Sequence, residues 1–272
     1  MRVTEFIEGS CCWDRRAPAR LREQVFGDAS AWKSYSTSRC LDGSNPDILY
    51  TIECSGHAID SAVSVEWLSP VLAARWENIG LQFASEADLS DMEFRQTLVS
   101  SLDFIGMDHS LAGTVAGLCR SLHVLVASGN DFDTSYSDPS LPLSVFVSCP
   151  LPAERNRVER LTENIVHEAL HLQLSLVERV QPLVIDDPDE EPVFSPWKDE
   201  WRSVRGLMHA VYVFGNLRSF WKGVASKRPE SSSFAQTRIQ TIDAEMADAA
   251  HLASNKSLTA AGRRLATSLL SS

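Results

Sequence analysis

The chain has 272 residues, of which 44% are hydrophobic and 22% are charged, a composition typical of a globular protein with a sizeable buried core. Its 36 acidic and 25 basic residues give a formal net charge of −11 at pH 7. This balance argues against a general nucleic-acid binder, because phosphate contacts need a dense Lys/Arg surface, and it favours a neutral or basic partner.

The sequence gives no sign of a disulfide framework or of a membrane protein. The six cysteines form no C-x-x-C pair, so we expect reduced thiols. The N-terminal residues show no charged-then-apolar leader, and no run approaches the ~18 apolar residues that a membrane-spanning helix needs. We therefore expect a cytoplasmic protein with no membrane partner.

We expect a single domain over residues 1–272, of which residues 1–105 are poorly determined by the sequence. Within them, Arg15 to Phe26 is a basic amphipathic segment and Asp47 to Cys54 has the character of a strand. Apolar residues recur at spacings of three and four from Ser64 to Ile79 and from Glu86 to Ile105, which predicts two helices.

Residues 106–227 are expected to form the core around a metal site. The pattern from Leu111 to Ala127 predicts a helix that contains His123, and we do not expect this histidine or His109 to bind the metal. Leu143 to Ser148 is rich in β-branched and aromatic residues and predicts a short strand. The strand is either an ordinary edge strand or one whose exposed edge binds an extended peptide.

The most informative motif is His167-Glu168-Ala169-Leu170-His171, on a helix expected from about Ala153 to Val180. Residues four apart lie on one face of a helix, so the two imidazoles can bind one metal ion, and Glu168 lies about a quarter-turn away. The alternative is a pair of hydrogen-bonded histidines beside a salt-bridging glutamate.

A second helix is expected to begin at Ser195 or at Ser203, after an acidic loop at residues 186–191 that is either solvated or a lid. Arg202, Arg205 and His209 would lie on one face of this helix. His209 is the preferred third metal ligand, and Glu191, Asp199 and Glu200 are the alternatives. Residues 228–272 are expected to form a C-terminal helical segment.

Three stretches of the chain together resemble the HExxH-motif peptide-modification proteins. They are His167 to His171, Ser195-Pro196-Trp197, and the pattern Arg-x-x-Arg-Gly-x-x-His-x-x-Tyr-x-Phe from Arg202 to Phe214, and the strand from Ser144 to Ser148 also fits. The chain departs from the usual pattern at Ser203, where the family has proline, and at Ala210, where it has glycine. The resemblance is strongest from about residue 140 to 225.

The resemblance implies an Fe(II)- and 2-oxoglutarate-dependent enzyme that uses O₂ to hydroxylate a β-carbon in a ribosomally synthesised precursor peptide. His167, His171 and His209 would then bind iron, and Arg205, or else Arg202, would bind the distal carboxylate of 2-oxoglutarate. Glu168 would orient a ligand or a substrate group. The fold class that we expect is α+β and predominantly α-helical, with a zincin-like metal-bearing helix after a short β-strand.

Two other functions remain open at this point. The protein could be a zinc metallopeptidase in which Glu168 is the general base that activates a zinc-bound water. It could also be a non-catalytic zincin-like domain that only binds a peptide. The hydroxylase and the peptidase make opposite demands on Glu168, so a substitution of this residue separates them.

Overall fold

The computed structural model of the chain describes residues 17–27, 35–53, 62–126, 134–150 and 154–271. The chain divides into two compact units, residues 14–172 and residues 173–272. The division falls within one long helix, α8 (Arg157–Val180).

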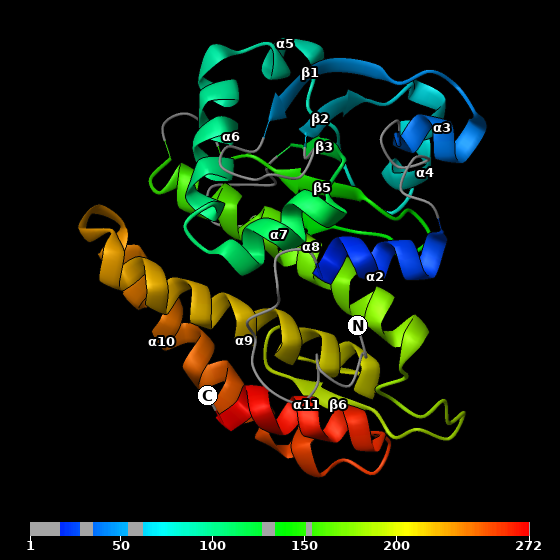
Figure 1. Cartoon of the computed structure of the whole chain (residues 1–272), viewed down its shortest axis with the longest axis vertical. Coiled ribbons are helices and arrows are strands. Elements are labelled where there is room, and N and C mark those ends of the chain that lie inside the picture. The colour runs from blue at the N-terminus through cyan, green and yellow to red at the C-terminus, as the bar shows by residue number, and fades with distance from the viewer. Residues whose placement is uncertain (1–16, 28–34, 54–61, 127–133, 151–153, 272) are drawn as a thin grey trace. The chain divides into compact units, whose positions relative to one another are not determined.

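The unit of residues 14–172 contains a five-stranded mixed sheet (Figure 1). Its strands are β1 (Asp47–Glu53), β2 (Ala62–Trp67), β3 (Ser121–Leu125), β4 (Ser135–Tyr136) and β5 (Ser144–Ser148), in the order β1-β2-β3-β5-β4. The three inner strands β2, β3 and β5 are parallel, and the two outer strands run antiparallel to their neighbours. Parallel strands need crossover connections, and the connection from β2 to β3 contains the helices α4 to α7.

The helices of this unit are α2 (Ala17–Phe26), α3 (Thr37–Asp42), α4 (Pro70–Glu77), α5 (Glu86–Leu89), α6 (Met92–Ile105) and α7 (His109–Leu118), with α8 starting after them. On one face of the sheet, Trp76 of α4 packs against Phe146 of β5 with ring centroids 4.9 Å apart. Leu72 and Leu125 are buried in the same cluster. The protein is thus α+β and rich in helix, as expected.

Two helix predictions were wrong over part of their length. Residues 62–67 form strand β2 and only 70–77 are helical, while residues 121–125 form strand β3 after the helix α7 ends at Leu118. All five residues of this inner parallel strand are buried, including the polar Ser121 and His123. A short, fully buried strand cannot be distinguished from a helical segment by apolar spacing alone.

The unit of residues 173–272 is helical apart from one small hairpin. Its helices are α9 (Val204–Lys227), α10 (Ser232–Asp248) and α11 (Ala260–Ser271), with the short 3₁₀ helices η2 (Pro229–Ser231) and η3 (Ala249–Ser254). The hairpin consists of β6 (Val193–Ser195) and β7 (Glu200–Arg202). Arg218 of α9 ties the helices together, because its guanidinium donates to the Leu269 carbonyl of α11 at 2.8 Å and to Asp243 of α10 at 3.4 Å.

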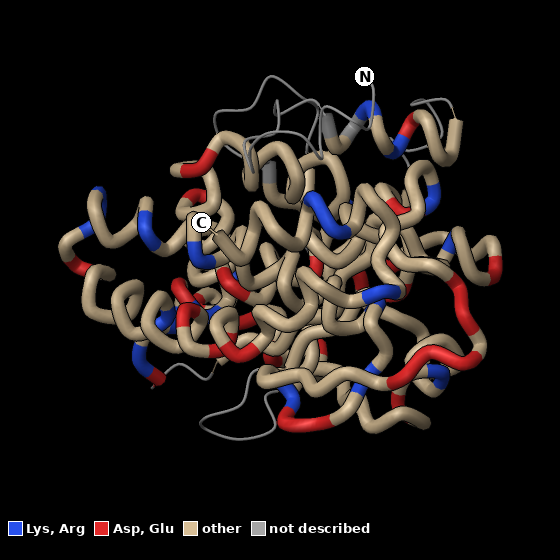
Figure 2. The backbone as a smooth tube through the Cα atoms, turned by 90° about the horizontal axis from the view of Figure 1, so that it is seen from below, with Lys and Arg blue, Asp and Glu red and all other residues tan. Residues whose placement is uncertain are grey.

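Basic and acidic residues are mixed along the chain, with an excess of acidic ones. Figure 2 shows Lys and Arg interspersed with Asp and Glu along the backbone. None of the helices in the described ranges is both long and apolar enough to span a membrane.

Candidate metal site

Helix α8 presents one polar stripe and is otherwise buried. Between residues 160 and 178, every residue is buried except six half-buried ones. These six lie at spacings of three and four, which places them on one face of the helix. All six are polar: Arg160, Glu163, His167, His171, Ser175 and Glu178. Between residues 160 and 178, the histidine pair therefore lies in the stripe of α8 that solvent reaches.

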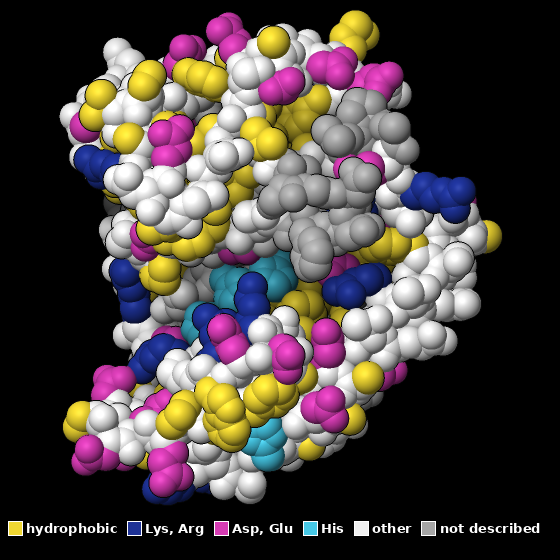
Figure 3. Space-filling model, turned by 180° about the vertical axis from the view of Figure 1, so that it is seen from behind, with side chains coloured by type: hydrophobic (Ala, Val, Ile, Leu, Met, Phe, Trp, Pro, Cys, Tyr) yellow, Lys and Arg dark blue, Asp and Glu magenta, His cyan; other side chains and the backbone are white. Residues whose placement is uncertain are grey.

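The two histidines converge through their Nε2 atoms. His167 Nε2 and His171 Nε2 lie 3.1 Å apart, with ring planes inclined by 63°. Two imidazole nitrogens bound to one ion at about 2.0–2.1 Å, with an angle of about 90–109° at the metal, are about 2.8–3.4 Å apart. The pair thus fits a shared metal ion, although the same distance suits a hydrogen bond between neutral imidazoles. On the face in Figure 3, histidine side chains reach the surface, and the side chain of His167 is 22% exposed.

Glu168 lies beside this pair in a more buried position. Its Oε1 is 3.9 Å from His167 Nε2, and its side chain is only 4% exposed. Its negative charge also reaches Tyr136 on the outer strand β4. Burial, the charge and hydrogen bond of Asp138, and the charge of Glu168 together raise the pKa of the Tyr136 phenol. Tyr136 is therefore a neutral phenol that is hydrogen-bonded to Asp138 and lies within reach of the charge of Glu168, and the sequence analysis missed it.

Hydrogen bonds hold the histidine-bearing part of α8 in place. The amide of Asn164, one turn before His167, donates to the Ser148 carbonyl at 3.4 Å and so joins α8 to β5. The hydroxyl of Ser101 on α6 donates to the Val158 carbonyl at 3.1 Å. These contacts fix the helix between the sheet and α6, which favours a preorganised site.

The expected exposed edge on β5 is absent. Strand β5 is fully buried and pairs with β3 on one side and with β4 on the other, where Tyr136 pairs with Phe146. The segment is a strand, as predicted, but an inner one. In the described part of this sheet, the outer strands are β1 and β4, and an extended peptide could add to either of them.

Arg205 and His209 lie on α9 and contact the same carboxylate. In the unit of residues 173–272, Glu178 Oε1 accepts from Arg205 NH1 at 2.9 Å, and Glu178 Oε2 lies 3.0 Å from His209 Nε2. Arg205 NH2 also donates to Asp186 at 2.7 Å. The sequence analysis missed Glu178, whose signal was its position seven residues after His171 on the same helix face.

Glu178 does not complete a metal site with the histidine pair along α8. At a rise of 1.5 Å per residue, its Cα lies about 10 Å from that of His171 and about 16 Å from that of His167 along the helix axis. A single ion requires ligand atoms within about 2 Å of it. Glu178 is therefore a partner of Arg205 and His209 and not a third ligand to the pair.

Arg202 is not on the helix that carries Arg205 and His209. It is the last residue of β7, and its Nε lies 3.4 Å from Glu200 Oε1 at the surface. Helix α9 begins at Val204, with Ser203 as the N-cap whose Oγ accepts from the Gly206 N–H. Ser203 was one of the two predicted helix starts, and the other, Ser195, ends β6 instead. A shared helix face for Arg202, Arg205 and His209 was therefore wrong for Arg202.

The alternative third ligands lie around the β6–β7 hairpin. Glu200 is exposed on β7, and Asp199 has a positive φ of 51° in the turn. The neighbouring acidic loop is tied to α9, because Glu190 accepts from the Val204 N–H at 2.5 Å and Asp186 binds Arg205. At least part of the loop thus caps the start of α9, where carboxylates are favoured by the helix dipole.

The structure brings together two of the three predicted metal ligands. In the described part of the chain, no group of three or more His, Cys, Asp or Glu side chains is arranged to hold a metal ion. His209 belongs to the other compact unit from His167 and His171, and its assignment as a ligand stays a prediction.

His123 belongs to a buried polar chain, as expected for a core histidine. Its Nδ1 is 3.2 Å from the Glu66 carbonyl, which can only accept, so Nδ1 carries the proton and Nε2 accepts from Thr37 Oγ1 at 2.6 Å. Thr37 Oγ1 is 2.8 Å from Ser144 Oγ, which is 2.9 Å from the Tyr35 hydroxyl. Burial lowers the pKa of His123 to about 4, against the opposing charge of Glu66.

No protein-family model and no curated protein matches the sequence.

Proposed function

We propose that the protein is a non-haem Fe(II)- and 2-oxoglutarate-dependent hydroxylase that acts on a β-carbon of a residue in a ribosomally synthesised precursor peptide. The observation that supports a metal enzyme is the 3.1 Å separation of His167 Nε2 and His171 Nε2 in the polar stripe of a buried helix. The resemblance supports the choice of reaction. When bound, iron and 2-oxoglutarate supply the oxidation: O₂ gives one oxygen atom to the peptide C–H and one to 2-oxoglutarate, which leaves as succinate and CO₂.

In this proposal α8 acts as a zincin-like metal-bearing helix. His167 and His171 hold the ion through Nε2, and His209 is the third ligand, assigned from the sequence pattern. A metal-bound histidine usually donates its other ring N–H to a carboxylate, which fixes the orientation of the imidazole. Glu178, 3.0 Å from His209 Nε2, is a carboxylate that can do this if His209 binds through Nδ1.

Arg205 suits the distal carboxylate of 2-oxoglutarate because it already binds carboxylates. Of its two partners, Glu178 has a side chain that is 8% exposed and is the permanent one, whereas that of Asp186 is 93% exposed. Exposed ion pairs contribute about 0–1 kcal/mol, so a ligand carboxylate can displace Asp186 at little cost. Arg202, with its exposed position on β7, is the weaker candidate.

Glu168 and Tyr136 would position the reacting groups. The buried carboxylate of Glu168 can accept from a polar group of the substrate or from a metal-bound ligand, and the neutral phenol of Tyr136 can donate a hydrogen bond. Neither residue has to transfer a proton for C–H hydroxylation.

A zinc metallopeptidase is the second candidate, and the position of Glu168 favours it. A buried carboxylate within 4 Å of a metal-binding imidazole is well placed to take a proton from a metal-bound water. The two functions differ in what Glu168→Gln should do.

The deciding experiment follows both reactions in one assay. The protein is incubated with a precursor peptide encoded beside its gene, either with Fe(II), ascorbate, 2-oxoglutarate and O₂ or with Zn²⁺ alone. We expect succinate and a peptide heavier by one oxygen atom in the first mixture, with partial activity in Glu168→Gln. Peptide cleavage in the zinc mixture that disappears in Glu168→Gln, with no oxygen gained in either, would replace the hydroxylase by the peptidase.

A further inference from the structure

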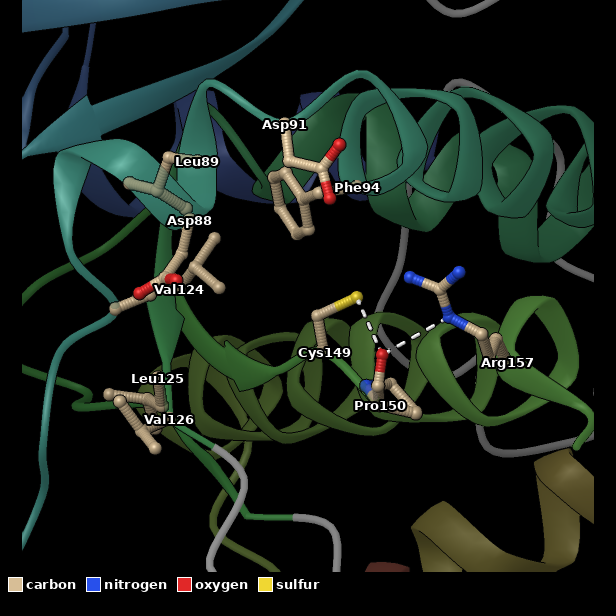
Figure 4. A pocket seen from close by; sticks show the side chains of 11 residues that line it. Asp88, Leu89, Asp91, Phe94, Val124, Leu125, Val126, Cys149, Pro150 and Arg157 are labelled. Atoms are coloured by element: carbon tan, nitrogen blue, oxygen red, sulfur yellow. Dashed lines mark hydrogen bonds between the residues drawn. The ribbon is translucent and has the colours of Figure 1, made fainter. Parts of the chain in front are cut away.

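A cavity of about 260 Å³ lies in the unit of residues 14–172, at the carboxyl ends of two parallel strands (Figure 4). Val124 and Leu125 of β3 line it, as do Cys149 and Pro150, which follow β5. Open sheets of parallel strands usually bind ligands beyond the carboxyl ends of their strands. The cavity is slightly smaller than the roughly 300–1,000 Å³ of sites for drug-sized molecules, so its ligand would be small.

One wall of the cavity carries a single cation. Arg157, in the first turn of α8, donates from Nε to the Pro150 carbonyl at 3.2 Å, which fixes the plane of its guanidinium. Its NH1 forms an ion pair with Glu93 at 3.6 Å, and because the side chain of Glu93 is 64% exposed, a ligand carboxylate can displace it at little cost. The side chain of Arg157 is only 15% exposed. Such a planar, oriented group is suited to bind a carboxylate through two parallel hydrogen bonds.

The opposite wall carries two anions. Figure 4 shows Asp88 and Asp91 on the α5–α6 side of the cavity and Arg157 on the α8 side. Hydrogen bonds from Ser85 lower the pKa of Asp88, so its carboxylate is charged at neutral pH. Asp91 accepts from the Glu93 N–H at 3.0 Å as the N-cap of α6. Both positions are fixed by helix capping, and both favour a cationic group nearby.

The remaining lining is apolar. It comprises Ala84, Leu89, Phe94, Val124, Leu125, Val126 and Pro150 together with the thiol of Cys149. A ligand that matches these walls has an apolar body, one carboxylate and one ammonium group. A dianion such as 2-oxoglutarate matches poorly, because its second carboxylate would face Asp88 and Asp91.

We infer that this cavity binds a zwitterionic amino acid with an apolar side chain, its carboxylate on Arg157 and its ammonium group facing Asp88 and Asp91. The site is separate from the histidine pair and does not depend on the proposed oxidation. A bound amino acid would cover Cys149, whose thiol faces the cavity in Figure 4.

The test measures protection of Cys149 from a small alkylating reagent in metal-free protein, with L-leucine as the probe. Peptide mass spectrometry reports each cysteine separately, and the exposed Cys40 is the internal control. We expect saturating L-leucine to slow alkylation of Cys149 about tenfold and to leave Cys40 unchanged. Isothermal titration calorimetry gives a second measure of binding that does not depend on the reactivity of the thiol.

Two analogues separate the charges of the ligand. 4-Methylpentanoate keeps the carboxylate and lacks the amine, whereas 3-methylbutylamine keeps the amine and lacks the carboxylate. We expect each to bind about tenfold more weakly than L-leucine, as for the loss of one charged hydrogen bond. If 4-methylpentanoate binds as tightly as L-leucine, the assignment of Asp88 and Asp91 is wrong.

Variants test whether binding occurs in this cavity. Arg157→Gln should weaken L-leucine about tenfold or more, whereas Arg155→Gln, which removes an exposed arginine two residues away, should not. Val126→Trp places a large side chain at a half-exposed position of the lining and should abolish binding without disturbing the core. The inference is overturned if calorimetry detects no binding to the unmodified chain, or if Arg157→Gln and Val126→Trp bind L-leucine normally.

Discussion

If His167 and His171 together bind a metal ion, the loss of either histidine should release the ion. Two imidazoles from one helix turn give a bidentate site, and the loss of either leaves a single ligand on α8. We therefore expect His167→Ala and His171→Ala each to remove bound metal, measured by elemental analysis after reconstitution with Fe(II) or Zn²⁺. His109→Ala, at an exposed position in the first turn of α7, is the matched control and should keep its metal. Full metal content in either helix variant would mean that the pair is only hydrogen-bonded.

Arg205 and its two carboxylate partners give a sharper test of the 2-oxoglutarate site. Arg205→Ala should weaken 2-oxoglutarate by about 2 kcal/mol, the usual value for a charged hydrogen bond, and leave the metal content unchanged. Asp186→Ala should bind 2-oxoglutarate at least as tightly as the unmodified chain, because it removes a competing carboxylate. Calorimetry on the metal-loaded protein measures both. If Arg202→Ala binds 2-oxoglutarate more weakly and Arg205→Ala does not, the residue that binds its distal carboxylate is Arg202 on β7.

The sequence showed the helical metal motif but not its surroundings. The pattern of His167 and His171 is local, so helix geometry alone places the two rings together. Glu178 was missed because its contacts come from α9, and Tyr136 because a two-residue strand leaves almost no pattern. Arg202 was misplaced because helix α9 begins only after the N-cap at Ser203. Of these three positions, that of Glu178 is decided by contacts between segments far apart in the chain, which one sequence does not contain.

Two glycines show how closely the helices of residues 173–272 pack. A Cβ added at Gly262 in α11 would lie closer to the Leu183 carbonyl than van der Waals contact allows. This carbonyl belongs to the backbone, so it cannot shift without distorting the chain. Gly262→Ala should therefore lower the free energy of unfolding by about 2 kcal/mol or more. A Cβ at Gly223 in α9 would contact nothing, and Gly223→Ala should raise the free energy of unfolding by about 0.5–1 kcal/mol. Urea unfolding measures both, and equal effects would contradict this packing.

The elements that were predicted well are those with long periodic patterns. Helix α8 extends over 24 residues and ends at Val180 as expected, and α9 begins after the predicted cap at Ser203. The sheet was largely missed, because β2 and β3 are short inner strands whose apolar residues also fit a helix. The sequence thus indicated an α+β protein but not the order of its strands.

The buried series of hydrogen-bonded side chains that includes Thr37 of α3 and His123 of β3 makes the free energy of unfolding depend on pH. His123 is neutral when folded, with a pKa of about 4 against 6.5 for the exposed side chain, so the unfolded chain binds a proton more readily between these values. Its contribution to stability is complete above pH 6.5 and is lost as the pH falls toward 4. We expect urea unfolding to show a loss of roughly 2 kcal/mol between pH 6.5 and 4.5 that is absent in His123→Asn. Parallel pH profiles for the two proteins would contradict this prediction.

At the scale of the whole molecule, α8 is the element that both compact units share. Its residues 157–172 belong to one unit and residues 173–180 to the other, while its hydrogen bonds form one continuous helix. Helix formation is cooperative, so loss of structure on one side of Leu172 should propagate across it. His171 immediately precedes Leu172, and His167 lies one helical turn before His171. We therefore expect the stability of the metal site to depend on the packing of residues 173–272.

Native-state hydrogen exchange with Gly262→Ala tests this coupling. The substitution acts in α11, on the side of residues 173–272, and should lower the protection of the α8 amides at 174–180. If the helix couples the units, the amides at 165–172 should lose protection by a similar free energy, about 2 kcal/mol. Gly223→Ala, in the same unit, is the control and should not lower protection on either side. A loss confined to residues 174–180 would show that α8 opens separately in the two units, and the histidine pair would then keep its geometry when residues 173–272 are destabilised.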